Sequence, residues 1–241
     1  MQFERLTYPP TDAPLLDAYD RRFEAAYVIL HPFVSVPDDL AWKVTRAYPS
    51  DEQILRLGAK SSWASVAAQT GLPTCAKLNH ALLTSNQSID EDLRDYAASD
   101  ALKRFLKSAS VWMPAEGRFE PLLQMDFLFA FDAARHEELV FVPESPGAEP
   151  VQCLRVSRLR NSSDAFPWRG TLAAPNASFL LTVNCDSFFT LFYGPREFLA
   201  QVASRRKLEG FFATPTTDHA WFNYSMGCSA VTLSPESWTT P

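Results

Sequence analysis

The order in which its hydrophobic patterns occur constrains the fold of this 241-residue chain more than any other feature. Residues 1–110 carry helix signals, in which capping residues precede apolar side chains spaced three and four residues apart. From about residue 119 onward, short apolar runs with strand character follow one another. Strands in succession after a group of helices are typical of α+β proteins. We therefore predict an α+β fold, with a helical N-terminal part packed on a mostly antiparallel sheet formed by the C-terminal half.

The predicted helices are marked by residues that favour helix ends. Ser50 and Gln53 form a capping box. The strongest periodic pattern covers Ile89–Leu106, with acidic residues in the first turn and basic residues in the last. The other predicted helices begin at Asp12, at Ser61 or Ser62 (stopping at Gly71), and at Pro195.

Several apolar runs have the composition of strands. They are Ala25–Leu30, Leu122–Phe131, Leu139–Val142, Val151–Leu159, Ser178–Asn184 and Ser187–Tyr193. The loop 143–150 is expected to connect two strands of a long hairpin. We treat residues 1–241 as a single domain, with a sub-boundary near residues 113–117.

Glycine usage and charge exclude several classes of function. The chain has 8 glycines, and they do not form the clustered motifs of phosphate-binding loops, dinucleotide folds or nucleophile elbows. Its 22 basic and 28 acidic side chains give a net charge of −6, without the basic block that a nucleic-acid binder usually presents. We therefore expect neither a Walker-type ATPase nor a typical Rossmann enzyme, and we do not expect nucleic acid as a partner.

The cysteines and the N-terminal residues indicate a cytoplasmic protein. The 4 cysteines lie far apart and form no C-x-x-C pair, so no metal site is predicted, and no cofactor is expected. The first thirty residues lack the pattern of a signal peptide, and no apolar run approaches the length of a membrane span. We therefore expect reduced cysteines, a cytoplasmic location and no contact with a membrane.

Two groups of residues combine a histidine with carboxylates. His136 lies among three acidic residues, which could bind a metal or move protons, although a solvated turn is the alternative. Asp218 and His219 precede Trp221, so His219 could act as a general base or stack on a ligand. The alternative there is a half-buried cluster of aromatic side chains. His136, Asp218, His219 and Trp221 are our candidate ligand- or partner-binding residues, and no catalytic residue is assigned.

The segment Trp63–Leu82 has the spacing of a helix-turn-helix. Its second helix would present Thr74, Lys77 and Asn79 to bases or phosphates, with His80 beside them. An ordinary helical hairpin is the alternative, because an expected apolar position falls on Lys77.

Short motifs at both ends of the chain resemble a bacterial family of unknown function. The family's closing part is similar to DSFFTLFY at Asp186–Tyr193, LEGFF at Leu208–Phe212 and HAW at His219–Trp221, and its opening is similar to YVILHPF at Tyr27–Phe33. This resemblance implies no activity, because the family has none assigned. The strand–helix–strand ending also resembles small bacterial immunity-type proteins, which act by occluding a partner.

Three functions stay open. The first is a bacterial protein that binds a protein partner, as an inhibitor or immunity-like protein, through aromatic side chains such as Trp221 or Trp238. The second is a small-molecule enzyme or ligand-binding protein with a cleft at the helix–sheet junction. The third is a helix-turn-helix DNA-binding regulator. We favour the first, because the chain lacks catalytic motifs and its aromatic content is 13%.

Overall fold

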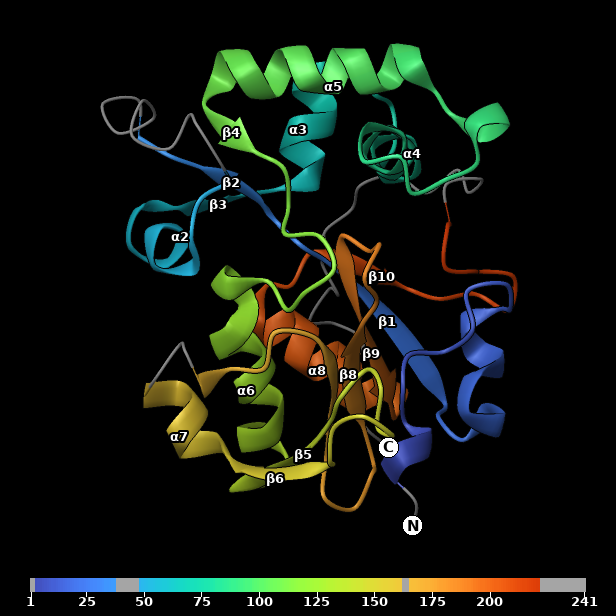
Figure 1. The fold of residues 1–241 in the computed structure, drawn as a ribbon, viewed down its shortest axis with the longest axis vertical. Helices are drawn as coiled ribbons and strands as arrows, with labels where there is room; N and C mark the ends of the chain where they lie inside the picture. The colour runs from blue at the N-terminus through green and yellow to red at the C-terminus, as the bar shows by residue number, and fades with distance from the viewer. Residues whose placement is uncertain (1–2, 38–47, 162–164, 222–241) are drawn as a thin grey trace, which may run out of the picture.

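The computed structural model describes residues 3–37, 48–161 and 165–221, and its central feature is a seven-stranded sheet (Figure 1). The strand order is β10-β1-β9-β8-β7-β5-β6, and every neighbouring pair is antiparallel. The strands are β1 (Ala25–Leu30), β5 (Glu138–Val142), β6 (Gln152–Arg155), β7 (Gly170–Ala173), β8 (Leu180–Val183), β9 (Phe189–Gly194) and β10 (Gly210–Phe212). The predicted α+β class is confirmed, as is the hairpin that joins β5 to β6.

A smaller sheet extends from the same N-terminal strand. Its order is β3-β2-β4, with β2 (Phe33–Ser35), β3 (Ala59–Ser61) and β4 (Val111–Trp112) paired in antiparallel fashion. Figure 1 shows β2 leading directly out of β1, so one stretch of chain belongs to both sheets. The predicted sheet of the C-terminal half therefore contains one N-terminal strand, β1, which lies between β9 and β10.

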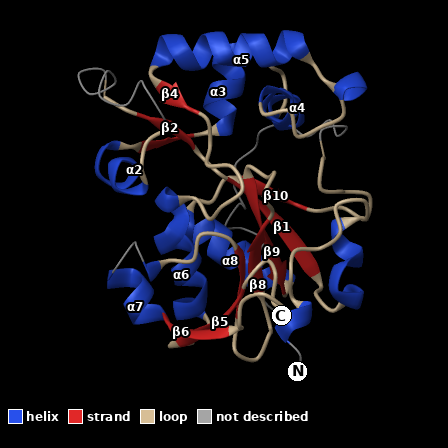
Figure 2. Ribbon diagram, viewed as in Figure 1, coloured by secondary structure: helices blue, strands red, loops and turns tan. Residues whose placement is uncertain are grey.

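The helices surround the large sheet and the small one (Figure 2). They are α2 (Asp51–Leu57), α3 (Trp63–Thr70), α4 (Cys75–Ser85), α5 (Tyr96–Ala109), α6 (Gln124–Ala133), α7 (Val156–Asn161) and α8 (Arg196–Arg206), with short 3₁₀ turns at Phe3–Arg5, Leu15–Arg21, Glu91–Leu93 and Pro121–Leu123. The predicted capping box of Ser50 and Gln53 is present, and α3 begins after Ser62. It ends at Gly71, whose φ of 73° is left-handed, as expected of a glycine that ends a helix.

Both faces of the large sheet are buried, except at the edge strand β6. In β1, the side chains of Ala25, Tyr27 and Ile29 contact one hydrophobic cluster, which includes residues of α6, α7 and α8. The alternate side chains of β1 contact the other cluster, which includes α3, α4 and α5. Because every position of β1, β7, β8 and β9 is buried, these strands read as continuous apolar runs rather than as alternating patterns. The predicted packing of the N-terminal helices on the sheet is confirmed.

One predicted strand is a helix. The run Leu122–Phe131 forms a 3₁₀ turn followed by α6. The helix buries two polar residues, Gln124 and Asp126, and exposes an apolar one, Met125. This reversal removes the 3.6-residue pattern that distinguishes a helix from a buried strand.

Three other boundaries differ from those predicted. The run Val151–Leu159 forms a strand as far as Arg155 and then turns into α7. The helix expected from Ile89 begins at Tyr96, because Asp95 accepts a hydrogen bond from the Ala98 N–H and caps it there. The helix expected after Asp12 is a 3₁₀ segment, interrupted by left-handed residues.

Two observations bear on the predictions about the membrane and about the oxidation state of the cysteines. Among the described residues, no helix combines the length and the apolar character that a membrane span requires. Cys153 and Cys185 are free and exposed. Cys75 is disulfide-bonded, which differs from the expectation of reduced cysteines.

Candidate ligand-binding cleft

A cleft of about 800 Å³ opens where α2 and the chain around β4 approach the large sheet. Its lining includes Tyr48, which precedes α2, Asp51 and Glu52 from the first turn of α2, and Glu116 and Arg118 from the segment after β4. The indole of Trp168, just before β7, completes the wall. These residues come from three segments that lie far apart in the sequence.

The segment that carries Arg118 is fixed by its backbone. The Gly117 N–H donates to Ser187 O at 2.9 Å, and the Phe119 N–H donates to Trp168 O at 2.9 Å. Gly117 has a φ of 66°, and a Cβ on it would lie 2.2 Å from the carbonyl oxygen of Cys185. Glycine is therefore required, because the chain is left-handed and pressed against a neighbouring turn at this point.

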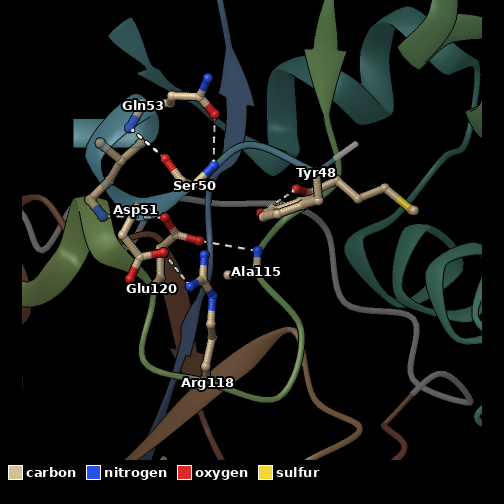
Figure 3. Close-up of polar contacts among 9 residues, drawn as sticks. Tyr48, Ser50, Asp51, Gln53, Ala115, Arg118 and Glu120 are labelled. Atoms are coloured by element: carbon tan, nitrogen blue, oxygen red, sulfur yellow. Dashed lines mark hydrogen bonds and ion pairs between the residues drawn. The ribbon is translucent and has the colours of Figure 1, made fainter. Parts of the chain in front are cut away.

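Arg118 lines the cleft, and Figure 3 shows its side chain beside Asp51 and Glu120. Its side chain is 6% exposed, and its guanidinium forms an ion pair with Asp51, the first residue of α2. The guanidinium carbon lies 4.3 Å from the ring centroid of Trp168 and 5.8 Å from that of Tyr48. Arginine stacks readily on aromatic rings, so the ion pair and the two rings together hold the side chain in one place.

The two rings that flank Arg118 remain accessible. Trp168 is 60% exposed and Tyr48 is 42% exposed. The Tyr48 hydroxyl donates to Met113 O at 3.2 Å, and its ring meets Trp112 edge to face at 6.0 Å. Tyr48 is therefore anchored at both ends while one side of its ring faces the cleft.

Behind the cleft, the carboxyl group of Glu120 is fully buried. Its Oε2 accepts from the Ala115 N–H at 3.1 Å and its Oε1 from the Leu122 N–H at 3.2 Å (Figure 3). Burial raises the pKa of Glu120 to about 7, although both N–H groups and Arg118 act in the opposite direction. The carboxyl group thus holds the chain before and after Arg118 in a fixed conformation.

His31 binds the carbonyl group of the same residue, Ala115. Its Nδ1 lies 2.8 Å from Ala115 O and its Nε2 lies 2.8 Å from Thr190 Oγ1. A carbonyl oxygen can only accept, so Nδ1 carries the proton and Nε2 accepts from the threonine hydroxyl. Burial lowers the pKa of His31 to about 4, which keeps the ring neutral. Ala115 is therefore held at its N–H by Glu120 and at its carbonyl group by His31.

The residues predicted from the sequence lie elsewhere. His136 is half-buried at the end of α6, with its ring 6.2 Å from that of Phe179 on the α6–α8 side of the sheet. Asp218, His219 and Trp221 lie together on the opposite side, around Phe189. The structure therefore brings three of the four candidates together and separates them from His136, and none of the four lines the cleft.

The contacts of the three grouped candidates favour a packed aromatic cluster. Asp218 Oδ1 accepts from the Trp221 N–H at 2.8 Å, and His219 Nδ1 lies 2.7 Å from the Tyr8 hydroxyl. Burial lowers the pKa of His219 to about 4. Trp221 is 1% exposed, so it is not a surface contact for a partner. Trp238 lies outside the described residues.

The predicted helix-turn-helix is a pair of packed helices. Every residue of α4 is buried or half-buried. Asn79 is fully buried, and Lys77 forms an ion pair with Asp95. The burial of most of α4 is in keeping with the helical-hairpin alternative.

Sequence reasoning missed the cleft because no local pattern marks it. Arg118 follows an isolated glycine, and Trp168 stands in an irregular stretch. The nearest signal was the predicted sub-boundary at residues 113–117, which forms part of the cleft wall. No group of three or more His, Cys, Asp or Glu side chains in the described ranges converges closely enough to hold a metal ion.

Comparison with known proteins places the chain in a family. Residues 11–223 match the model described as "Protein of unknown function (DUF2711)". The chain belongs to the DUF2711 family. It is 21% identical over 221 residues to the "Uncharacterized protein YwbB" of Bacillus subtilis (strain 168), covering 88% of this chain and 96% of that protein. No solved structure matches it significantly.

Membership of DUF2711 confirms the resemblance to an uncharacterised bacterial family. The matched range includes every cleft residue named above, from Tyr48 to Trp168. Neither the family nor the Bacillus relative has a described function, so functional inference rests on the geometry of the cleft.

Proposed function

We propose that this DUF2711 protein binds a small organic molecule in the cleft around Arg118. The observation that carries the proposal is a nearly buried arginine, fixed by Asp51 and stacked on Trp168, whose ring is itself widely exposed. The proposal corresponds to the ligand-binding alternative considered from the sequence, with different residues.

The size and lining of the cleft support this proposal. A volume of about 800 Å³ falls within the range of small-molecule sites, roughly 300–1,000 Å³. Such sites combine aromatic walls with a few fixed polar groups. Here Tyr48 and Trp168 supply the walls, while Asp51 and Arg118 supply polar groups that are held before a ligand arrives.

A ligand-observed NMR screen of a metabolite library against the full chain tests the proposal. We expect some compounds to show altered NMR signals in the presence of the wild-type chain. In the presence of Trp168→Ala their signals should be those of the free compound, because this variant removes the exposed ring and leaves the core intact. Tyr96→Ala is the matched control, since Tyr96 is also an exposed aromatic but lies on α5 outside the cleft lining. A library without hits, or hits that bind Trp168→Ala as well as wild type, would contradict the proposal.

Binding of a protein partner is a second candidate. The observation in its favour is that Tyr48 and Trp168, with Arg118 between them, are the residue types that dominate protein interfaces. A pull-down from bacterial lysate with wild type and Trp168→Ala tests it. A protein retained by wild type and lost by the variant supports this candidate, and equal recovery by both counts against it.

A further inference from the structure

We infer that the ligand of the cleft is an organic cation, such as an amine or a guanidinium compound. This inference rests on the proposed function and adds the chemical class of the ligand. It follows from the charges left uncompensated in the cleft and from the rings that line it.

Among the described residues, the lining of the cleft carries more negative than positive charge. It includes the carboxylates of Asp51, Glu52 and Glu116, and Arg118 is the one cation that the described part of the chain contributes. Asp51 and Arg118 neutralise each other through their ion pair. None of the ion pairs formed within the described residues involves Glu52 or Glu116. Two acidic side chains thus line the cleft without an ion-pair partner among the residues that the structure describes.

Glu116 is placed where a cation would be favourable. Its carboxylate accepts a hydrogen bond from the Asn86 side-chain amide, and Asp186 lies close enough to repel it. Burial and this neighbouring charge raise the pKa of Glu116. A positively charged group in the cleft would relieve both effects by compensating the charge.

The aromatic rings fit the same ligand class. Trp168 already holds one cation, the guanidinium of Arg118, over its ring. Much of its indole remains exposed, and Tyr48 presents part of its phenol ring nearby. Aromatic faces attract cations and repel anions, because the electron density of the ring lies above and below its plane.

An anionic ligand fits these observations less well. It would need Arg118, which is already paired with Asp51, and it would face Glu52 and Glu116. These carboxylates would repel an anionic ligand, and salt would only partly screen the repulsion because the site is partly desolvated.

Three compounds with one ring and different charges test the inference. Benzylammonium, benzyl alcohol and benzoate are titrated into the full chain, with binding followed by calorimetry and NMR. Benzylammonium is expected to bind about fivefold or more tightly than benzyl alcohol, and benzoate the most weakly, as follows from one unit charge a few ångströms from partly screened carboxylates. Raising the salt concentration should reduce the preference for benzylammonium.

Charge-neutral variants locate the effect. Glu52→Gln and Glu116→Gln are each expected to weaken benzylammonium about fivefold and to leave benzyl alcohol unchanged. Glu91→Gln is the matched control, because Glu91 is exposed in a 3₁₀ turn and does not line the cleft.

The outcomes separate this inference from the proposed function. If benzoate or benzyl alcohol binds in the cleft as tightly as benzylammonium, the cation inference fails and ligand binding stands. If benzylammonium does not bind, or binds both glutamine variants as it does wild type, the inference also fails. The library screen then decides the proposed function separately.

Discussion

Single residues determine how the cleft is built. Glu120, His31 and Gly117 do not line the cleft, yet they fix the backbone that carries Arg118. Each does so through a different physical property: a buried carboxyl group, a neutral imidazole and a left-handed backbone. These properties can be tested one at a time.

The first test concerns the pH dependence of stability. The folded pKa of Glu120, about 7, lies above that of an unfolded glutamate. Below the unfolded pKa, Glu120 therefore makes its full contribution to the free energy of unfolding. As the pH rises toward 7, up to about 3 kcal/mol of this contribution is lost. Urea denaturation across pH 4.5–8 should show that Glu120→Gln removes this loss.

Histidines act in the opposite direction at lower pH. His31 and His219 have depressed pKa values of about 4, so their contributions are present above pH 6.5 and are lost as the pH falls. The Glu120 effect is therefore read from the difference between wild type and variant at each pH. Parallel stability curves for the two proteins would show that Glu120 does not titrate as described.

Gly117 and Gly71 form a matched pair for the second test. Both have positive φ, but a Cβ at Gly71 would meet nothing within 4 Å, while one at Gly117 would overlap Cys185 O. Gly71→Ala should cost about 1 kcal/mol, the penalty of the left-handed backbone. Gly117→Ala should cost about 3 kcal/mol, because the clash is added. Equal losses in chemical denaturation would be incompatible with the described packing of the segment.

At the scale of elements, the sequence predicts some features well and others poorly. Ser50, Ser62 and Gly71 act within a few residues of the helix ends they define, so they could be predicted. The α6 helix could not, because it buries Gln124 and Asp126 and exposes Met125, which reverses the pattern on which helix prediction depends. Its buried acid, Asp126, is explained by partners that lie far away in the sequence.

Asp126 gives the third prediction. Its nearly buried carboxylate binds Lys60 of β3 and Arg206 of α8, with nitrogen–oxygen distances of 2.5 Å to each. Asp126→Asn should destabilise the fold by about 2 kcal/mol, because two cations lose their partner. Asp132→Asn is the control on the same helix, since its ion pair with Arg160 is exposed and should contribute about 0.5 kcal/mol. A similar effect of both variants on urea midpoints would rule out this role for Asp126.

For the molecule as a whole, the sequence predicted the α+β class but not the site. The class follows from the order of apolar runs, which is a property of the chain itself. The cleft depends on contacts of Arg118 with Asp51 of α2 and with Trp168, which precedes β7. These residues lie far apart in the sequence, so no local pattern predicts their contact. His136 and His219 were predicted as binding residues because their side chains titrate, yet they lie on opposite sides of the sheet.

The affinity of benzylammonium for wild type and Trp168→Ala, measured by calorimetry, tests the central claim most directly. The claim is that the exposed indole beside Arg118 is part of a site for an organic cation. Loss of the ring should weaken binding about tenfold, while Tyr96→Ala should bind as wild type does. Equal affinity of wild type and Trp168→Ala would show that the cleft is not the binding site.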